Sequence, residues 1–431
     1  MLNKEKFFLY CDRLIIVFFC LMIFCLPFSK AGVESFVWPA IFIFILKRIL
    51  GYRANSAWGF LPKTKLNIAL GAFIAVNVLS VIFSTDLGLS LRGLFGKNLK
   101  FLAIYFMLAE VINSKKRLKV VLISIISSAV FIIIDAGVMY FKGVDFLRGH
   151  ELGLYPFCAS FSNSTGFAAW LIVIIPLFIG IIVANIIPGL RFKILLSAAV
   201  IIQFLYLIKT YSRGGWFGFL VGITFIVYYV LKNSNSIVKR LCIITAVSLL
   251  TISLLLPQSV VKNIKYYIWV NFPFSHQINE RLKTMPYGPS TSTRIMLWKE
   301  SLRIISDHPL LGCGLNTYSI VAKKYKSFEG GGVYPHNSYF QMVAETGLPG
   351  LFAFLFVLYS FFRMGLKYLN QRKDYLTLGF LSGILAFLVH AFFDNHLYSL
   401  QLVVLFWFML GLTVAVIKLE PGVISIKNEK E

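Results

Sequence analysis

Long apolar stretches follow one another along almost the whole of this chain, and they restrict it to folds built inside a membrane. Every backbone polar group in the hydrocarbon must be hydrogen-bonded within the protein, which favours helices. Hydrophobic residues make up 58% of the 431 residues and charged residues only 14%. The sequence therefore predicts an all-α, polytopic membrane protein. At about 20 residues a span, the apolar stretches predict about twelve transmembrane helices, at 13–29, 33–49, 66–84, 100–113, 118–141, 167–187, 194–209, 214–231, 240–256, 346–363, 376–393 and 397–417.

A polar segment, residues 257–335, interrupts this succession between the ninth and tenth predicted spans. Connections of such length usually have a function of their own. An enzyme that acts on a polar substrate at the membrane surface needs residues outside the hydrocarbon. We therefore expect spans 1–9 over residues 1–256, a large, partly helical outer loop over 257–345, and spans 10–12 with a C-terminal tail over 346–431.

The outer loop is expected to contain short amphipathic helices. The first begins at Arg294 and ends before Pro309, because the residue before a proline disfavours the helical conformation. A second short helix is predicted over 316–325 and a third over 338–345, and Gly347–Gly350 marks the turn into the tenth span. The apolar side of the first helix is predicted to carry Ile295, Trp298, Leu302 and Ile305.

The distribution of Lys and Arg predicts the orientation. More than half of the 42 basic residues lie in short segments that face the cytoplasm when the N-terminus is inside, as the positive-inside rule requires. The 257–335 segment is then outside. The net charge of +24 fits either attraction to anionic lipid head groups or a phosphate-binding outer surface. No nucleic-acid-binding module is visible.

The sequence YSRGGW, Tyr211–Trp216, lies at the outer junction of the seventh and eighth spans. Ser212 can cap the following helix, and Gly214 and Gly215 leave its first N–H groups uncovered. A helix start of this kind binds anions, and the planar guanidinium of Arg213 suits phosphate oxygens. An arginine whose charged group reaches the interface beside a glycine packing contact explains the motif as well.

His336 is the candidate general base, because it lies between a glycine-rich break and the return into the membrane. An imidazole titrates near neutral pH and can accept a proton from a hydroxyl nucleophile. Asn337 can orient either the ring or a sugar. Arg294 can hold a phosphate or pair with a carboxylate such as Glu300. A loop histidine is also compatible with a purely structural role.

Further polar residues have two interpretations each. Four basic residues on the outer side extend a phosphate-binding rim or are simply solvated: Arg92, Lys97, Lys100 and Arg148. A polar group near the outer end of the last hairpin faces a cavity or caps the hairpin: His390, Asp394 and Asn395. Glu110 and Asp135, within spans, are candidates for interior pairing.

The six cysteines show no metal-ligand spacing, and no paired-carboxylate, HExxH or phosphate-loop motif occurs. We therefore expect neither a metal nor a cofactor. Cys158 and Cys313 would both face the outer compartment, so a disulfide between them is possible. The sequence does not establish their separation.

Three blocks, taken together and in this order, resemble the O-antigen ligase family of membrane glycosyltransferases. They are YSRGGW (211–216), TRIMLWKESLRIISDHPLLGCGLNTY (293–318) and YPHNSYFQMVAETGLPGLFAF (334–354). A looser fourth block is FSNSTGFAAWL (161–171), where Thr165 replaces a common second asparagine. The first 140 residues match only as hydrophobic spans.

The resemblance implies a metal-independent, inverting enzyme at the outer face of a bacterial inner membrane. Ligases of this family transfer polysaccharide from undecaprenyl diphosphate to lipid A–core. Carried over by position, the family's two arginines fall on Arg213 and Arg294, and its histidine falls on His336. The arginines would stabilise the leaving diphosphate, and the histidine would deprotonate the acceptor hydroxyl.

Two alternatives remain open from the sequence. A polysaccharide polymerase or a protein O-oligosaccharyltransferase of the same superfamily would share all three blocks. A solute transporter is a different class of protein, and the large outer loop and the lack of an inverted repeat disfavour it.

Overall fold

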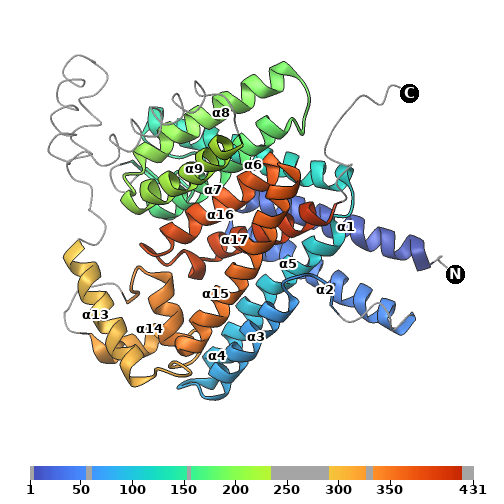
Figure 1. The fold of residues 1–431 in the computed structure, drawn as a ribbon. Helices are drawn as coiled ribbons and strands as arrows, with labels where there is room; N and C mark the ends of the chain where they lie inside the picture. The colour runs from blue at the N-terminus through green and yellow to red at the C-terminus, as the bar shows by residue number, and fades with distance from the viewer. Residues whose placement is uncertain (1–3, 55–60, 153–156, 234–290, 327–332, 420–431) are drawn as a thin grey trace, which may run out of the picture.

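The computed structural model describes residues 4–54, 61–152, 157–233, 291–326 and 333–419. Helices account for most of these residues (Figure 1). Within the same ranges the only β-type pairing is an isolated bridge between Val144 and Glu151. The prediction of an all-α chain is therefore confirmed.

The described residues form the following helices, in chain order. They are α1 (Lys4–Cys25), α2 (Lys30–Ala54), α3 (Asn67–Ile82), α4 (Leu87–Gly93), η2 (Leu94–Asn98), α5 (Leu99–Val111), α6 (Lys115–Lys142), α7 (Ser164–Ala184), α8 (Leu190–Lys209), α9 (Arg213–Lys232), α13 (Thr291–Asp307), α14 (Tyr318–Val321), η3 (Ala322–Tyr325), α15 (Ser338–Arg372), α16 (Tyr375–His390), η4 (His396–Tyr398) and α17 (Leu400–Lys418).

Seven of the described helices are long and apolar enough to cross a membrane, namely α1, α6, α7, α8, α9, α15 and α17, and the apolar helices α3 and α16 are shorter. Every predicted span except the ninth coincides with one of the described helices. The ninth, 240–256, lies outside the described residues, as does the whole of the 257–290 stretch. A membrane protein is supported, and the count of twelve spans stays a prediction.

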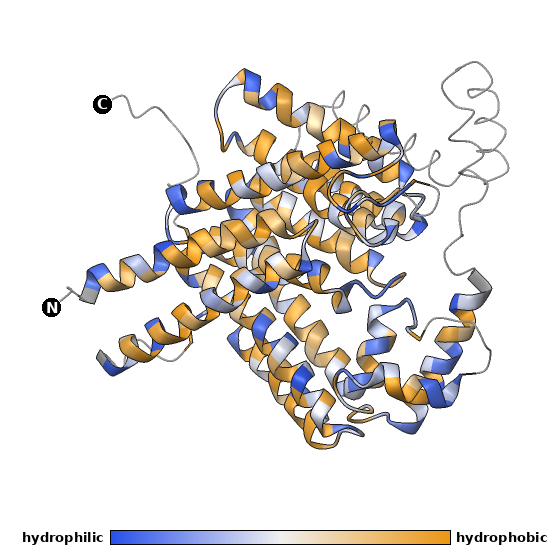
Figure 2. Cartoon of the chain, turned by 180° about the vertical axis from the view of Figure 1, so that it is seen from behind, coloured by the Kyte–Doolittle hydropathy of each residue, from blue (hydrophilic) through white to orange (hydrophobic). Residues whose placement is uncertain are grey.

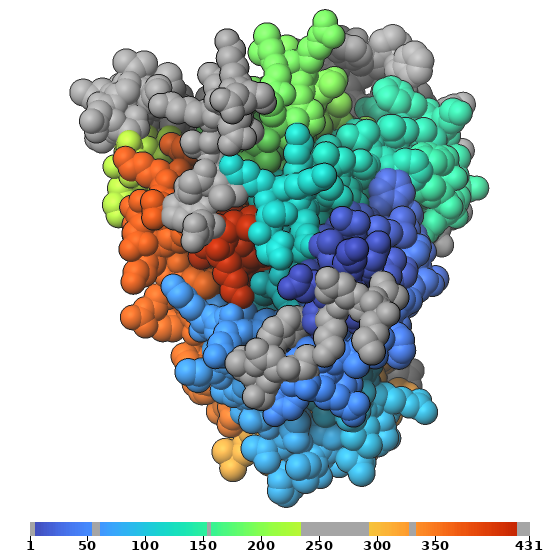
Figure 3. All heavy atoms as spheres, turned by 90° about the vertical axis from the view of Figure 1, so that its right-hand side faces the viewer, coloured from blue at the N-terminus to red at the C-terminus, as the bar shows by residue number. Residues whose placement is uncertain are grey.

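Apolar side chains fill the centre of the bundle and also cover its outside. α17 is buried from Gln401 to Val416, and from the side it shows only as a small red patch between its neighbours (Figure 3). Large apolar side chains on outer helices are exposed, among them Phe42, Ile68 and Phe141. Hydrophilic residues gather toward helix ends (Figure 2). This is the pattern of a bundle whose outer surface contacts lipid.

Small residues bring α16 into close contact with α7 and α9. A Cβ atom on Gly218 of α9 would lie 2.5 Å from the carbonyl oxygen of Ala386, and one on Gly383 of α16 would lie 2.7 Å from that of Val173. The hydroxyl of Ser382 donates a hydrogen bond to the Gly222 carbonyl at 2.7 Å. Such contacts are typical of helix packing in membranes. They fix the start of α9 beside the end of α16.

A break in α15 attaches the outer segment 308–316 to the bundle. Gly347 has a φ of 70° and a ψ of 179°, which interrupts the helix. The carbonyls of Ala344 and Glu345 accept hydrogen bonds from the N–H groups of Cys313 (2.8 Å) and Gly314 (3.1 Å). The predicted turn at Gly347–Gly350 is therefore present as a kink between two helical parts of α15, and the 308–316 segment satisfies the carbonyls that the kink frees.

Helix α13 occupies the predicted position, but its buried side differs from the prediction. Ile295 and Leu302 are 46% and 48% exposed. The buried positions are Leu297, Glu300, Ser301 and Ile304, so the buried side is shifted by about one residue, or about 100°, from the predicted one. The predicted apolar side is therefore wrong at Ile295 and Leu302, while Trp298 and Ile305 are half-buried, because the sequence pattern does not show which side meets the bundle.

A buried charged cluster lies at the end of the bundle where α1 begins and α2 ends. The Nζ atom of Lys47 lies 2.5 Å from Asp12 Oδ1 and 2.7 Å from Glu110 Oε1. Arg117 Nη1 lies 3.0 Å from Asp12 Oδ2. The predicted interior pairing of Glu110 is confirmed. Asp135 also has interior partners, because its carboxylate accepts hydrogen bonds from Phe146 N and Ser160 Oγ.

The close approach of α9 and α16 can be tested by adding one methyl group. Gly218→Ala should lower the stability of the detergent-purified protein by about 1–3 kcal/mol, because the added Cβ overlaps the Ala386 carbonyl. The measurement is the thermal unfolding midpoint. Gly71→Ala is the matched control, since a Cβ there meets nothing within 4 Å. Equal midpoints for the two variants would contradict this packing.

Candidate functional site

The turn between α16 and α17, residues 391–399, is the centre of the candidate site. The start of α15 is hydrogen-bonded to it, because Ser338 N donates to the Ala391 carbonyl at 2.9 Å and Ser338 Oγ donates to the Asp394 carbonyl at 2.8 Å. Asn337 caps α15, since its Oδ1 accepts from the N–H groups of Tyr339 and Phe340. The residue before this cap, His336, is therefore held beside the turn.

His336 pairs with Asp394 of this turn. The distance from His336 Nδ1 to Asp394 Oδ1 is 3.0 Å, and the two side chains are 27% and 15% exposed. The backbone of His336 has a φ of 48°, in the left-handed region. A non-glycine residue adopts this conformation only where its surroundings enforce it. The contacts of Asn337 and Ser338 supply that enforcement.

The ionisation state of Asp394 determines which ring nitrogen of His336 carries a proton. Burial by itself would raise the pKa of Asp394, but the hydrogen bond from His336 and the proximity of His396 hold this pKa well below its usual range. Asp394 is therefore ionised and can only accept hydrogen bonds. His336 Nδ1 consequently carries the donated proton, and its Nε2 presents the lone pair that can take a proton from a substrate.

Trp298 attaches α13 to the same place. Its ring lies edge-on to Phe340 of α15 at 5.6 Å and to Phe392 of the turn at 5.7 Å, and its Nε1 donates to the Pro335 carbonyl at 2.9 Å. Arg294 is one helical turn before Trp298. The positive charge of Arg294 acts on His396, whose pKa is lowered to about 4 chiefly by burial and further by this arginine.

The start of α9 contacts the turn from another side. Ser212 caps α9 by accepting from Gly215 N at 3.2 Å, and the same hydroxyl lies 3.2 Å from His390 Nε2. A Cβ on Gly214 would lie 2.7 Å from Phe393 Cβ. Arg213 is exposed. The backbone at Ser212–Gly215 is thus in contact with the α16–α17 turn, and Arg213 belongs to this segment.

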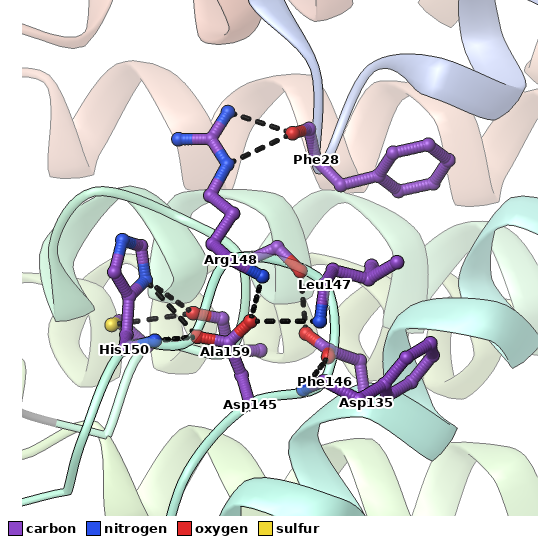
Figure 4. A network of polar contacts seen from close by, with 10 residues as sticks. Phe28, Asp135, Asp145, Phe146, Leu147, Arg148, His150 and Ala159 are labelled. Atoms are coloured by element: carbon purple, nitrogen blue, oxygen red, sulfur yellow. Dashed lines mark hydrogen bonds and ion pairs between the residues drawn. The ribbon is translucent and has the colours of Figure 1, made fainter.

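Lys100 and Arg148 have partners away from the α16–α17 turn. Lys100 is buried, and its Nζ lies 2.6 Å from Glu34 Oε1. Arg148 donates from Nε and Nη2 to the Phe28 carbonyl, at 3.0 and 2.7 Å (Figure 4). These contacts connect α5 to α2 and the segment after α6 to the α1–α2 turn. A role of either residue in binding substrate stays a prediction.

The thiols and the acidic groups of the described residues form neither a cross-link nor a metal centre. Cys158 and Cys313 are both buried free thiols, so they form no disulfide. No group of three or more His, Cys, Asp or Glu residues in the described ranges is arranged to hold a metal ion. A separate cavity of about 90 Å³ lies between α3, α15 and α17, with Lys97, Asn316 and Glu345 in its lining.

Comparison with known families connects this geometry to a known class of protein. Residues 198–355 match the family model described as O-antigen ligase. Over these residues the chain is similar to the O-antigen ligase family. The match includes Arg213, Arg294 and His336, and the resemblance inferred from the three sequence blocks is confirmed. No curated protein matches the chain.

The matched segment ends before the α16–α17 turn, because Asp394 lies beyond residue 355. The sequence places Asp394 in a polar group at the end of the last hairpin, but it does not predict the pairing with His336, 58 residues earlier. The sequence patterns do not single out His396. The density of polar residues at 390–396, between two strongly apolar helices, is the signal that indicates both.

The arrangement has a definite chemical capacity. An ionised carboxylate holds an imidazole in one orientation, as in nucleophile-activating sites of hydrolases and transferases. A guanidinium and the start of a long helix lie around the same turn, and both favour negative charge. Together they suit the attack of a hydroxyl group on a substrate whose leaving group is an anion.

Proposed function

We propose that this protein is an O-antigen ligase, a glycosyltransferase of lipopolysaccharide biosynthesis. It transfers polysaccharide from undecaprenyl diphosphate to lipid A–core in the bacterial inner membrane, with its site facing the periplasm. The observation that carries the proposal is the His336–Asp394 pair, 3.0 Å apart, in a chain whose residues 198–355 match the O-antigen ligase family model.

The acceptor sugar is activated by His336. Its Nε2 takes the proton of the acceptor hydroxyl while the oxygen attacks the anomeric carbon of the donor. The bond from this carbon to the diphosphate oxygen breaks, so the anomeric configuration inverts. Asp394 keeps the ring oriented and stabilises the imidazolium that forms.

The leaving diphosphate is stabilised by Arg213, Arg294 and the start of α9. Ser212 caps that helix, the close contact at Gly214 holds its first turn against the α16–α17 turn, and the N-terminus of the helix favours negative charge there. Fixed positive charge at the leaving group lowers the barrier most where water is excluded. The bond to the diphosphate supplies the free energy, so the proposed reaction requires neither ATP nor a metal ion.

The remaining predicted residues have secondary places in this proposal. Asn337 fixes the start of α15, and therefore the position of His336, through its two backbone contacts. Lys100 and Arg148 stand outside the proposed centre, because Glu34 and the Phe28 carbonyl account for their charged groups.

Deletion of the gene distinguishes the proposed ligase from its alternatives. We expect lipopolysaccharide without any O-chain on a gel, together with accumulated lipid-linked polymer, because transfer to the core is lost. Core that carries a single repeat unit would instead indicate a polymerase. Unchanged lipopolysaccharide would contradict both, and altered glycoproteins in that case would indicate a protein O-oligosaccharyltransferase.

Variants expressed in the deletion strain test the individual roles. His336→Ala, Arg213→Ala and Arg294→Ala should each abolish transfer while the protein still inserts. Asp394→Asn should lower the transfer rate by about 10²–10⁴-fold, because it removes the charge that supports the base. The measurement is the rate of O-chain attachment, normalised to membrane protein level.

His308→Gln is the matched control for these variants. This residue follows α13 and lies outside the proposed centre, so its substitution should leave the rate unchanged. A wild-type transfer rate in His336→Ala would show that His336 is not the base. A wild-type transfer rate in Asp394→Asn would show that the pairing of His336 with Asp394 is not needed for transfer.

A further inference from the structure

Buried polar atoms without a hydrogen-bond partner are concentrated at the candidate site. Within the described residues, five of the nine such side-chain atoms belong to it: Arg294 Nε, Asn337 Nδ2, His390 Nδ1, Asn395 Oδ1 and His396 Nε2. Buried polar groups in folded proteins are nearly always hydrogen-bonded. Their concentration at one place indicates a ligand that supplies the missing partners.

Two of these atoms belong to a pair of adjacent histidines. His390 and His396 are 1% and 3% exposed, and their ring centroids are 4.1 Å apart. His390 Nε2 lies 3.2 Å from Ser212 Oγ, which caps α9. The charge of Arg294 acts on both rings. The pair therefore lies beside the start of α9 and within reach of the positive charge of Arg294.

The surroundings of the pair favour an anion. Arg294 contributes a positive charge, and the N-terminus of α9, a helix of 20 residues, contributes a partial one. The nearby negative group, Asp394, is already paired with His336. Burial lowers the pKa of His396 to about 4, so this ring is neutral near pH 7 and offers one N–H as a donor.

The second ring can be a donor as well. The Ser212 hydroxyl accepts a hydrogen bond from Gly215 N, and its own hydrogen is available for His390 Nε2. In that arrangement His390 carries its proton on Nδ1, the buried atom that lacks a partner. The neutral rings thus present N–H groups to an anion without adding the cost of a buried charge.

We propose that His390 and His396 form the inner wall of a phosphate-binding site and donate their N–H groups to the diphosphate of the donor lipid. The proposal rests on the proposed function for the identity of the donor. It assigns two substrate-contacting residues outside the matched family domain. The ligand class it names is a diphosphate ester.

Binding of inorganic pyrophosphate to the full-length protein in detergent tests this site. Isothermal titration calorimetry gives the dissociation constant for the wild type and for His390→Phe and His396→Phe. Each substitution keeps an aromatic ring and removes the nitrogens, so the dissociation constant should rise by about tenfold to a hundredfold. His308→Gln is the control and should bind as the wild type does.

A second pair of variants separates binding from folding. His390→Gln and His396→Gln keep an N–H donor, so they should bind pyrophosphate more tightly than the phenylalanine variants. If the phenylalanine variants unfold, the glutamine variants are compared with the wild type instead. An unchanged dissociation constant in folded phenylalanine variants would overturn the proposal. A wild-type protein that does not bind pyrophosphate would overturn it as well.

The same experiment distinguishes this inference from the proposed function. Pyrophosphate binding that depends on both histidines, in a protein that transfers no glycan, would support the anion site and refute the ligase assignment. Glycan transfer by the phenylalanine variants with an unchanged Michaelis constant for the donor would refute the anion site alone.

Discussion

The attachment of α15 to the turn between α16 and α17 is the interaction on which the site depends. Two hydrogen bonds from Ser338 and the Asn337 cap fix where the helix begins. The preceding residue, His336, is thereby forced into a left-handed conformation beside Asp394. Without this attachment, the loop histidine would have no carboxylate partner and no fixed direction.

Packing between helices brings the other components to the same turn. Small residues on α9 and α16 allow close backbone approach, which places the Ser212 cap beside His390. Trp298 packs against Phe340 and Phe392 and thereby places α13, with Arg294, at the turn. The site therefore depends on the packing of the whole bundle, although the residues proposed for its chemistry are few.

The sequence block that ends at Tyr318 has a structural role, because the N–H groups of Cys313 and Gly314 donate to carbonyls freed at the α15 kink and so hold the 308–316 segment on the bundle.

Local patterns in the sequence predict the helices well, because apolar runs and proline or glycine breaks act within a few residues. They also single out His336 and the start of α9. They do not predict the buried side of α13, where Ile295 and Leu302 are exposed. Nor do they predict the Lys100–Glu34 pair or the His336–Asp394 pair. Each of these depends on contacts between distant segments.

The most direct test of this account is an experimental structure of the protein in lipid with an undecaprenyl-diphosphate-linked glycan bound. We expect the diphosphate within hydrogen-bond distance of Arg213 and Arg294, and the anomeric carbon on the side of His336. A diphosphate bound instead in the cavity beside Lys97 and Glu345, away from the α16–α17 turn, would contradict the account.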